Sequence, residues 1–583
     1  MMRRKVLTWF AVLLALAVAV SAQGWPQWGR TSIHNGSVSI SGQPAHKILA
    51  QVVYDPFTAQ ENVDPLCGGG LCIHYQTPLL DDDGDVYLEF KTGTYTSLAT
   101  WNTQIWNEQR LTWEDGALVQ VWAFQSDWKP IPYGSLVTGN GPAWEPVFHA
   151  ALDDDYIYVP GFGGTVYKLR KEDGSVAAHI NPFGTVDPNT YLSGPITVDP
   201  QGNIYYVTIK LQNIANVNPW DVDVVNSWLV KVTENGQISK VTYAALTRGA
   251  PGGNGCLGIF DTSTLPWPPS PDAVPPNVTC GGQRAAMNSA PAVGPDGTIY
   301  VGSVAHLWSR EAYMVAVNPD LTPKWHTSLR DRFLDGCNVL LPADPTNGGC
   351  RAGSHVGFDP AQNRPGAGRI IEDGTSSPVV APDGSVFLGA YTRYNYAQGH
   401  LMKFSVNGTY LAGYPFGWDD TPAIYQHDGT YSLLSKDNHY GGVGSYCNDD
   451  TWCPPNRTAS NPAYPEAYYM TQLSSNLVPE WQYQNTNTLS CTRNPDGSIT
   501  CVSDHPFGFE WCINAPAVDR NGVLYANSED GNVYEIRQGG GLRDKLFLQL
   551  AVGAPYTPIA VADDGKVYTE NFGTMFVVGS GGD

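Results

Sequence analysis

Two aspartate-rich runs are the first residues of this chain whose type and spacing suggest chemistry. Asp81-Asp82-Asp83-Gly84-Asp85 and Asp153-Asp154-Asp155 offer hard carboxylate oxygens of the kind that bind Ca²⁺. Both runs fall where a tight turn between two strands is predicted, and aspartate is common in such turns for backbone reasons. The spacing of an EF-hand loop is absent. We therefore favour turn residues over a calcium site at both positions.

Cysteine spacing predicts disulfide bonds rather than metal sites. Most of the 11 cysteines lie in close pairs, and such pairs in an exported chain are typically bonded. One bond is expected among Cys491, Cys501 and Cys512, with Cys491–Cys501 as the working pair, so an eleventh cysteine is free or intermolecular. Cys453 also begins a Cys-x-Pro-x-Arg match to the sulfatase modification pattern, but its flanking sequence does not match. The other predicted bonds are Cys67–Cys72, Cys256–Cys280, Cys337–Cys350 and Cys447–Cys453.

Tryptophans in predicted loops are the candidate ligand-binding residues. An indole ring offers a flat apolar face with a polar edge, which can stack on sugar rings or on the side chains of a partner protein. The alternative is that each ring covers a small core within its own loop. The candidates are Trp101, Trp128, Trp220, Trp308, Trp452 and Trp511.

Known catalytic motifs do not occur in the sequence. His-Glu-x-x-His, Gly-x-Ser-x-Gly and Gly-x-x-x-x-Gly-Lys-Ser/Thr are all absent. The 12 histidines are scattered, and we interpret His149 and His179 as packing residues in or beside strands. Residues from distant parts of the chain could still assemble around a central axis, so a catalytic site is kept as an alternative.

A repeated hairpin must position all of these residues. Each copy has a small or turn-forming residue, Pro, alternating apolar residues, a turn that is Asp-Gly or Asn-Gly in most copies, and then an apolar strand that usually carries tyrosine. Pro opens an inner strand without needing a hydrogen-bond donor, and Asp-Gly supplies the positive φ of the turn. A second hairpin follows each copy. The fold class is therefore predicted as all-β, an eight-bladed β-propeller of four-stranded antiparallel blades. The eight copies begin at Pro78, Pro146, Pro195, Pro291, Pro378, Pro422, Pro516 and Pro558.

The two ends of the chain are expected to complete the ring together. The last unit, Pro558 to Val578, supplies three strands, and an apolar strand from His46 to Tyr54 precedes the first repeat. We expect the N-terminal strand to serve as the fourth strand of the last blade. That pairing would close the circle and protect both terminal edges.

Long connections are predicted on one face of the ring. The turns between strands one and two, and between strands three and four, are short. The links between strands two and three and between blades are long, and all of the cysteines fall in this second class. Long loops in compact folds are commonly functional. The long links are residues 91–104, 210–227, 244–289, 327–376, 436–466 and 485–514.

The N-terminus predicts export. Arg3, Arg4 and Lys5 precede an apolar run, and Val20-Ser21-Ala22 forms a small-residue cleavage site, so residues 1–22 are interpreted as a signal peptide. Residues 23–583 are then predicted to form one propeller domain that is secreted, extracellular or, in a bacterium, periplasmic. The net charge of −22 argues against binding to nucleic acid or to anionic lipid, and no membrane span is predicted. Asn277 and Asn456 are candidate glycosylation sites in a eukaryotic secretory route.

The blade pattern resembles the quinoprotein-like eight-bladed propellers. The resemblance is carried by the opening segment Trp25-Pro26-Gln27-Trp28-Gly29-Arg30 and covers about Trp25 to Gly579. This superfamily includes pyrroloquinoline quinone (PQQ) dehydrogenases and a non-catalytic outer-membrane assembly lipoprotein. The chain departs from the dehydrogenases because it lacks adjacent cysteines and a Cys-x-x-Cys-His haem motif, and because its tryptophan-docking repeat is eroded. No calcium-ligand trio or catalytic aspartate can be placed by motif.

These observations favour a binding function. We expect an exported binding or scaffold propeller, a monomer without a cofactor, which recognises a glycan, peptide or protein through its large-loop face. One alternative is an oxidoreductase of alcohols or sugars that depends on PQQ and Ca²⁺. The other is a hydrolase or lyase with an axial active site.

Overall fold

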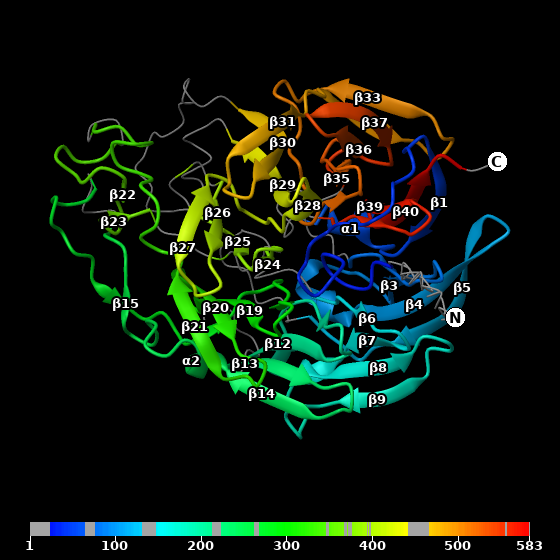
Figure 1. Cartoon of the computed structure of the whole chain (residues 1–583), viewed down its shortest axis with the longest axis horizontal. Coiled ribbons are helices and arrows are strands. Elements are labelled where there is room, and N and C mark those ends of the chain that lie inside the picture. The colour runs from blue at the N-terminus through cyan, green and yellow to red at the C-terminus, as the bar shows by residue number, and fades with distance from the viewer. Residues whose placement is uncertain are drawn as a thin grey trace, which may run out of the picture.

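Antiparallel sheets form a ring of eight blades around a central axis in the computed structural model (Figure 1). The arrangement confirms the predicted eight-bladed β-propeller of four-stranded blades. The structure describes residues 24–64, 76–130, 147–212, 223–261, 267–344, 349–366, 370, 376–392, 395, 398–440, 466–553 and 557–581.

The first four blades follow the chain in order. Each has an innermost strand of two residues and a longer outer strand. Blades 3 and 4 each carry one additional short strand, β10 and β17, which pairs with the second strand of the blade. The strands are β2 (Leu79–Leu80), β3 (Val86–Thr92), β4 (Ile105–Glu114) and β5 (Ala117–Gln125); β6 (Ala151–Leu152), β7 (Tyr156–Pro160), β8 (Val166–Arg170) and β9 (Val176–Ile180); β10 (Thr190–Leu192), β11 (Thr197–Val198), β12 (Ile204–Leu211), β13 (Val224–Val232) and β14 (Ile238–Thr242); and β17 (Gln283–Ala285), β18 (Ala292–Val293), β19 (Ile299–Ala305), β20 (Trp308–Val317) and β21 (Pro323–Ser328).

The last four blades repeat the same order, except that the final blade takes its outer strand from the N-terminus. The strands are β24 (Val379–Val380), β25 (Val386–Ala390), β26 (His400–Phe404) and β27 (Tyr410–Tyr414); β28 (Ala423–His427), β29 (Thr430–His439), β30 (Ala467–Ser474) and β31 (Pro479–Gln484); β34 (Ala517–Val518), β35 (Leu524–Asn527), β36 (Asn532–Arg537) and β37 (Gly541–Phe547); and β38 (Ala560–Val561), β39 (Val567–Asn571), β40 (Thr574–Gly579) and β1 (Lys47–Val53).

The inner hairpins have the turn geometry that Asp-Gly and Asn-Gly predict. Seven of the eight turns carry a glycine with positive φ, a conformation that only glycine adopts without strain. The turn of blade 2 has no glycine, and four residues separate the paired Leu152 and Ile157, against five in six of the other turns and two in blade 6. The seven glycines are Gly84, Gly202, Gly297, Gly384, Gly429, Gly522 and Gly565.

The N-terminal strand closes the ring as the sequence predicts. β1 pairs antiparallel with β40, with Ile48 opposite Val578 and Gln51 opposite Phe576. The two strands, from opposite ends of the chain, lie side by side in Figure 1. Because β40 would otherwise present a free edge, the closure protects the last blade from pairing with another chain.

The segment before β1 forms an inner belt, residues 25–43, whose role the sequence did not reveal. It hydrogen-bonds with the inner hairpin of every blade in chain order, mostly through the last residue of the innermost strand before the short turn. The belt therefore lies at the short-turn end of the axis. Its contacts are Trp25–Leu80, Pro26–Leu152, Gln27–Val198, Ser32–Val293, Ile33–Val380, Asn35–Ile424, Gly36–Val518 and Gln43–Gly565.

The core is divided among the interfaces between neighbouring blades. One cluster packs Tyr87 and Trp122 of blade 1 against Phe148 and Ile157 of blade 2, all less than one-tenth exposed. Alternating strand residues supply these contacts, as expected for sheets packed face to face. Each blade is therefore stabilised mainly by its two neighbours.

Small elements outside the blades belong mostly to the long connections. None of the helices in the described part of the chain is long and apolar enough to cross a membrane. These elements are α1 (Thr58–Glu61), α2 (Tyr243–Leu246), the 3₁₀ turns Leu98–Thr103 and Phe162–Gly164, and the hairpins β15 (Cys256–Leu257) with β16 (Asn277–Val278), β22 (Phe358–Asp359) with β23 (Arg364–Pro365), and β32 (Leu489–Arg493) with β33 (Ile499–Ser503).

Candidate binding face and accessory lobe

Three disulfides link residues within the long connections. Their sulfur–sulfur distances are 2.17 Å for Cys256–Cys280, 2.00 Å for Cys337–Cys350 and 2.04 Å for Cys491–Cys501. The first two are the pairings expected from the spacing of the cysteines, and the third is one of the pairings left open among Cys491, Cys501 and Cys512. Cys512 is buried and is free of any disulfide in the described part of the chain. Cys67, Cys72, Cys447 and Cys453 lie outside the described residues.

The connections between blades 3 and 4 and between blades 4 and 5 interlock into an accessory lobe, which comprises the described residues 249–261, 267–282, 330–344 and 349–366. The Phe260 amide donates to the Ala361 carbonyl (3.0 Å), and the Arg351 amide donates to the Trp267 carbonyl (2.7 Å). The Gln362 side-chain amide donates to the Leu257 and Gly258 carbonyls at 2.8 and 2.9 Å. The hairpins β15–β16 and β22–β23 of this lobe lie outside the ring, beside β21 and β27 (Figure 1).

Buried polar contacts hold the lobe to blades 4 and 5. Arg310 of β20 pairs with Asp359 of β22 at 2.5 Å, and both side chains are less than one-tenth exposed. Arg330 pairs with Glu311 of β20 at 2.9 Å, and its other terminal nitrogen donates to Gln362 (2.6 Å). Burial raises the pKa of Glu311 while Arg330 opposes the rise. Because two well-bonded ion pairs and two disulfides brace it, the lobe is a rigid element.

The lobe exposes four aliphatic side chains on neighbouring turns, which we call the aliphatic patch: Val274, Leu334, Val339 and Val356. Their exposed fractions are 76, 63, 50 and 58%. The turns are adjacent because Leu334 lies against Gly357, the Asn338 side-chain amide donates to the Ser354 carbonyl at 3.1 Å, and His355 is 3.8 Å from Asp272. Large exposed aliphatic groups that cluster on a rigid surface are typical of binding sites.

The structure contradicts the exposed-tryptophan hypothesis for three of the six candidates. Trp101 is 5% exposed, Trp128 3% and Trp511 0%, so their faces are unavailable for stacking on a ligand. Trp128 packs edge-on against Trp106 at 5.0 Å and near Phe148 at 5.4 Å. These rings fill gaps beneath long loops. The sequence alone does not distinguish a buried tryptophan in a loop from an exposed one. Trp308 is half-buried, and Trp220 and Trp452 lie outside the described residues.

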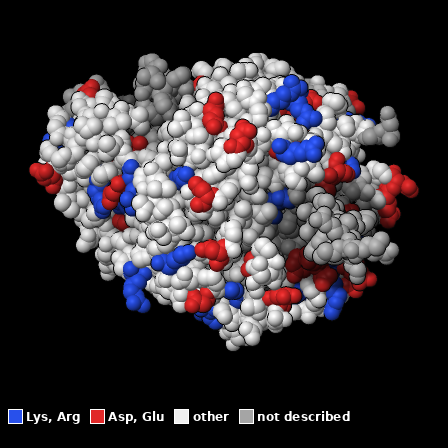
Figure 2. Space-filling view, viewed as in Figure 1, with Lys and Arg blue, Asp and Glu red and all other residues white. Residues whose placement is uncertain are grey.

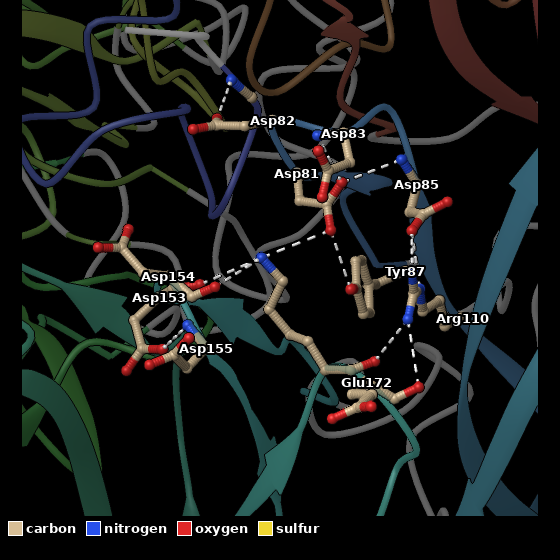
Figure 3. A network of polar contacts seen from close by, with 12 residues as sticks. Asp81, Asp82, Asp83, Asp85, Tyr87, Arg110, Asp153, Asp154, Asp155 and Glu172 are labelled. Carbon is tan, nitrogen blue, oxygen red and sulfur yellow. Dashed lines mark hydrogen bonds and ion pairs between the residues drawn. The ribbon is translucent and has the colours of Figure 1, made fainter.

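The aspartate runs act as turn residues, which supports that interpretation over a calcium site (Figure 3). One Asp81 carboxylate oxygen accepts hydrogen bonds from the Asp83 and Asp85 amides at 3.1 and 3.0 Å. The other oxygen accepts from the Tyr87 hydroxyl at 3.0 Å and lies 3.4 Å from the Lys171 ammonium. Since these donors already occupy both oxygens, Asp81 has little capacity left for a metal ion.

Asp153 repeats the arrangement in blade 2. It accepts from the Asp155 and Tyr156 amides at 2.9 and 2.6 Å and from the Tyr158 hydroxyl at 2.7 Å. The neighbouring Asp154 is exposed. The Lys171 ammonium, which lies 3.4 Å from Asp81, also donates to the Asp154 carbonyl at 3.0 Å and so links the two turns.

Buried carboxyl groups gather where blades 8 and 1 meet, and sequence motifs gave no sign of them. Glu89 of β3 pairs in register with Glu108 of β4, and Glu570 occupies the corresponding position of β39; all are 0% exposed. Burial is the main cause that raises the pKa of each group well above its usual value, and the Glu89 carboxyl adds to the rise at the other two. These groups favour the protonated form.

A lysine beside these carboxyls is already bound. The Lys91 ammonium lies 2.6 Å from Asp55 and 3.3 Å from Glu61, and all three side chains are almost completely buried. Burial raises the pKa of Glu61 to about 7, although Lys91 opposes the rise. The region therefore contains buried carboxyl groups that favour the protonated, uncharged form, and one lysine that is already paired with acidic side chains.

This chemistry does not fit a PQQ cofactor. PQQ carries three carboxylate groups, which need cationic or hydrogen-bond-donating partners, whereas the region offers mainly carboxyl groups. Lys91 is bound by its own acidic neighbours. This cluster of buried acids therefore does not provide a quinone-binding site.

The remaining predicted site residue in the described chain is Asn277. It is exposed at the start of β16 in the accessory lobe. Asn456 lies outside the described residues. Figure 2 shows acidic and basic side chains interspersed over the viewed face of the molecule.

Comparison with known proteins relates this chain to others by fold. No protein-family model and no curated protein sequence matches it. It is similar to a quinohemoprotein alcohol dehydrogenase from Comamonas testosteroni, with 12% identity and a TM-score of 0.52 over 97% of this chain and 82% of that one.

Two further solved structures align less closely. The quinohemoprotein alcohol dehydrogenase ADHIIG from Pseudomonas putida HK5 is 10% identical, with a TM-score of 0.48 over 96% of this chain and 76% of that one. BamB from Moraxella catarrhalis is 10% identical, with a TM-score of 0.35 over 81% of this chain and 94% of that one. At such identities a likeness concerns the fold alone. This chain therefore has the eight-bladed fold of the quinoprotein-like β-propellers.

Proposed function

We propose that this chain is an exported binding propeller that holds a partner protein through the aliphatic patch of its accessory lobe. The patch itself is the observation that carries the proposal. Its four side chains are at least half exposed, although burial of each would be favourable by about 1.5 to 3 kcal/mol. Such a surface gains stability when a partner covers it.

The surroundings of the patch favour a protein over a glycan. Aliphatic side chains provide no flat aromatic face for a sugar ring, whereas they pack well against apolar side chains. Exposed polar residues border the patch, including Asp272, His355 and Arg332. An apolar centre with a polar rim is the usual anatomy of a protein interface.

The rigidity of the lobe also supports this function. Loops that are held in one conformation before binding lose little conformational entropy in the complex. The two disulfides and the buried Arg310–Asp359 and Arg330–Glu311 pairs provide that restraint. Export is supported by the signal-like N-terminus and by the disulfides, which persist in oxidising compartments.

Site-specific photo-crosslinking of the full chain in its native host tests the proposal. A photoreactive amino acid at Val356 should give a discrete adduct with a partner protein. The same amino acid at Val176, an exposed residue of β9 on the outer edge of blade 2, is the matched control. Leu334→Asp should remove the Val356 adduct and weaken binding of the purified partner by about tenfold or more, as expected for a central contact.

Two results would contradict a docking role for the lobe. One is the same adduct pattern at Val356 and Val176, and the other is a Val356 adduct that persists in a folded Leu334→Asp variant. The thermal unfolding midpoint of Leu334→Asp should stay close to that of the wild type because Leu334 is 63% exposed. Loss of the adduct therefore reports on the surface and not on the fold.

A further inference from the structure

Three side chains with metal-binding atoms meet on the large-loop side of blade 7. They are Glu510 and Cys512, from the segment that leads into β34, and Glu529, from the turn between β35 and β36. One donor atom from each lies within 4.8 Å of the other two. The Cys512 sulfur is 3.1 Å from a Glu529 carboxylate oxygen.

The backbone holds these donors in place. The Glu529 amide donates to the Glu510 carbonyl at 3.1 Å, and the Ser528 hydroxyl donates to the same carbonyl at 2.8 Å. The Trp511 amide donates to the Asn438 side-chain oxygen at 3.1 Å, while the Asn438 side-chain amide donates to the Trp511 carbonyl at 3.3 Å. The two segments are thus fixed to each other and to β29, as a preformed metal site requires.

The thiol is unusual in its context. The Cys491–Cys501 disulfide lies in the same connection between blades, yet Cys512 stays outside it and is 4% exposed. Glu510 and Glu529 are partly exposed as residues, but their carboxyl groups point inward, and burial is the main cause that raises the pKa of both. Burial also raises the pKa of the Cys512 thiol, and the Lys436 ammonium opposes the rise in all three groups.

We propose that Glu510, Cys512 and Glu529 bind one zinc-type divalent cation. A thiolate with two carboxylates and one further position for water suits the four-coordinate geometry of Zn²⁺. Ca²⁺ and Mg²⁺ prefer sets made only of oxygen, so the thiol selects against them. On binding, the sulfur–metal bond forms as the thiol releases its proton to solvent. This site is independent of the accessory lobe.

Cobalt(II) is the probe, because a bond between a thiolate and Co²⁺ gives a ligand-to-metal charge-transfer band in the near ultraviolet. The folded wild-type chain should bind one Co²⁺ with that band, and Zn²⁺ should displace it. Cys512→Ser keeps the size of the side chain and should lose the band. Glu529→Gln should weaken binding by about tenfold or more, in line with the loss of a ligand.

The control variant is Asp496→Asn, which changes an exposed carboxylate on the β32–β33 hairpin of the same connection. It should bind Co²⁺ as the wild type does. Zn²⁺ should also raise the thermal unfolding midpoint of the wild type and not that of Cys512→Ser, since binding to the native state alone stabilises it. A wild type without a stoichiometric cobalt band, or a folded Cys512→Ser variant that keeps it, overturns the proposal.

Discussion

Aspartates at the start of the inner turns each serve several donors. In blade 3, Asp199 accepts from the Gln201 and Asn203 amides at 2.9 and 3.0 Å and from the Tyr205 hydroxyl at 2.9 Å. Asp81 and Asp153 do the same in blades 1 and 2. A single carboxylate thus fixes the turn and anchors a tyrosine of the second strand, which makes the residue a structural feature of the repeat.

We predict that Asp153→Ala destabilises the chain, whereas Asp154→Ala in the same turn does not. The first change leaves two backbone amides and the Tyr158 hydroxyl without their acceptor, which costs about 1 to 3 kcal/mol. The second removes an exposed carboxylate, with an expected effect within about 0.5 kcal/mol. Urea unfolding of both variants measures the difference. Equal midpoints would show that the Asp153 contacts do not stabilise the blade.

Single residues were only partly predictable from the sequence. Asp-Gly correctly indicated the turns, but the hydrogen bonds of the first aspartate were missed, although the spacing Asp81–Tyr87 and Asp199–Tyr205 could have revealed them. The prediction of exposed tryptophans was wrong for Trp101, Trp128 and Trp511, because the type of a loop residue does not determine whether it is buried. Leu334 and Val356 gave no signal, since an aliphatic residue in a loop is usually assumed to be covered.

The inner belt joins the blades to one another, because it hydrogen-bonds with the inner hairpin of all eight. Its Gln27 side chain bonds both ways with Val198, donating to the carbonyl at 3.0 Å and accepting from the amide at 2.7 Å, and it is 4% exposed. A side chain therefore continues the hydrogen-bonding pattern of the innermost strand of blade 3. Comparable contacts reach the other inner hairpins.

We predict that Gln27→Ala loosens blade 3 at the axis. The change leaves a buried amide and a buried carbonyl of Val198 without the partners that Gln27 provides, at a cost of about 1 to 3 kcal/mol. Hydrogen exchange should become faster in a peptide that contains Val198. The control is Gln51→Ala, an exposed position on β1. Unchanged protection at Val198 in the Gln27 variant would exclude a stabilising role for this contact.

Elements were predictable wherever they repeat. The hairpin pattern located the innermost strands within a few residues, because Pro and Gly impose the same backbone in most blades. The inner belt and the hairpins β15–β16 and β22–β23 were not predicted. Each occurs once in the chain, and both hairpins have strands of only two residues. Their structure depends on contacts between connections that are distant in sequence, such as Gln362 with Leu257.

At the scale of the whole molecule, the sequence predicted the ring and its closure. Counting the hairpins gave eight blades, and the unused apolar strand before the first repeat supplied the missing edge, as the β1–β40 register confirms. The distribution of buried acid was not predictable. Glu89, Glu108 and Glu570 occupy strand positions where the alternation of apolar residues predicts nothing about charge, and only the packing of blade 8 against blade 1 buries them together.

These buried acids lead to a prediction about stability and pH. Burial raises the pKa of Glu61, Asp420 and Glu535 to about 7, and it raises the pKa of Glu89, Glu108 and Glu570 well above the usual value of a glutamate. Between pH 4.5 and 7 the folded chain therefore binds more protons than the unfolded chain, so stability falls as the pH rises. Burial lowers the pKa of His34 to about 4 and also lowers that of His326. These two groups act in the opposite direction below pH 6.5 but are fewer than the six acids.

We predict a higher thermal unfolding midpoint at pH 5 than at pH 8 under constant ionic strength. Glu570→Gln replaces the protonated acid by a neutral side chain of similar shape. It should raise stability at pH 8, change it little at pH 5, and reduce the slope by up to about 1.4 kcal/mol per pH unit. The exposed Glu114→Gln, on blade 1, controls for the loss of one acidic residue. A midpoint that rises from pH 5 to pH 8 would mean that these carboxyls are ionised within the fold.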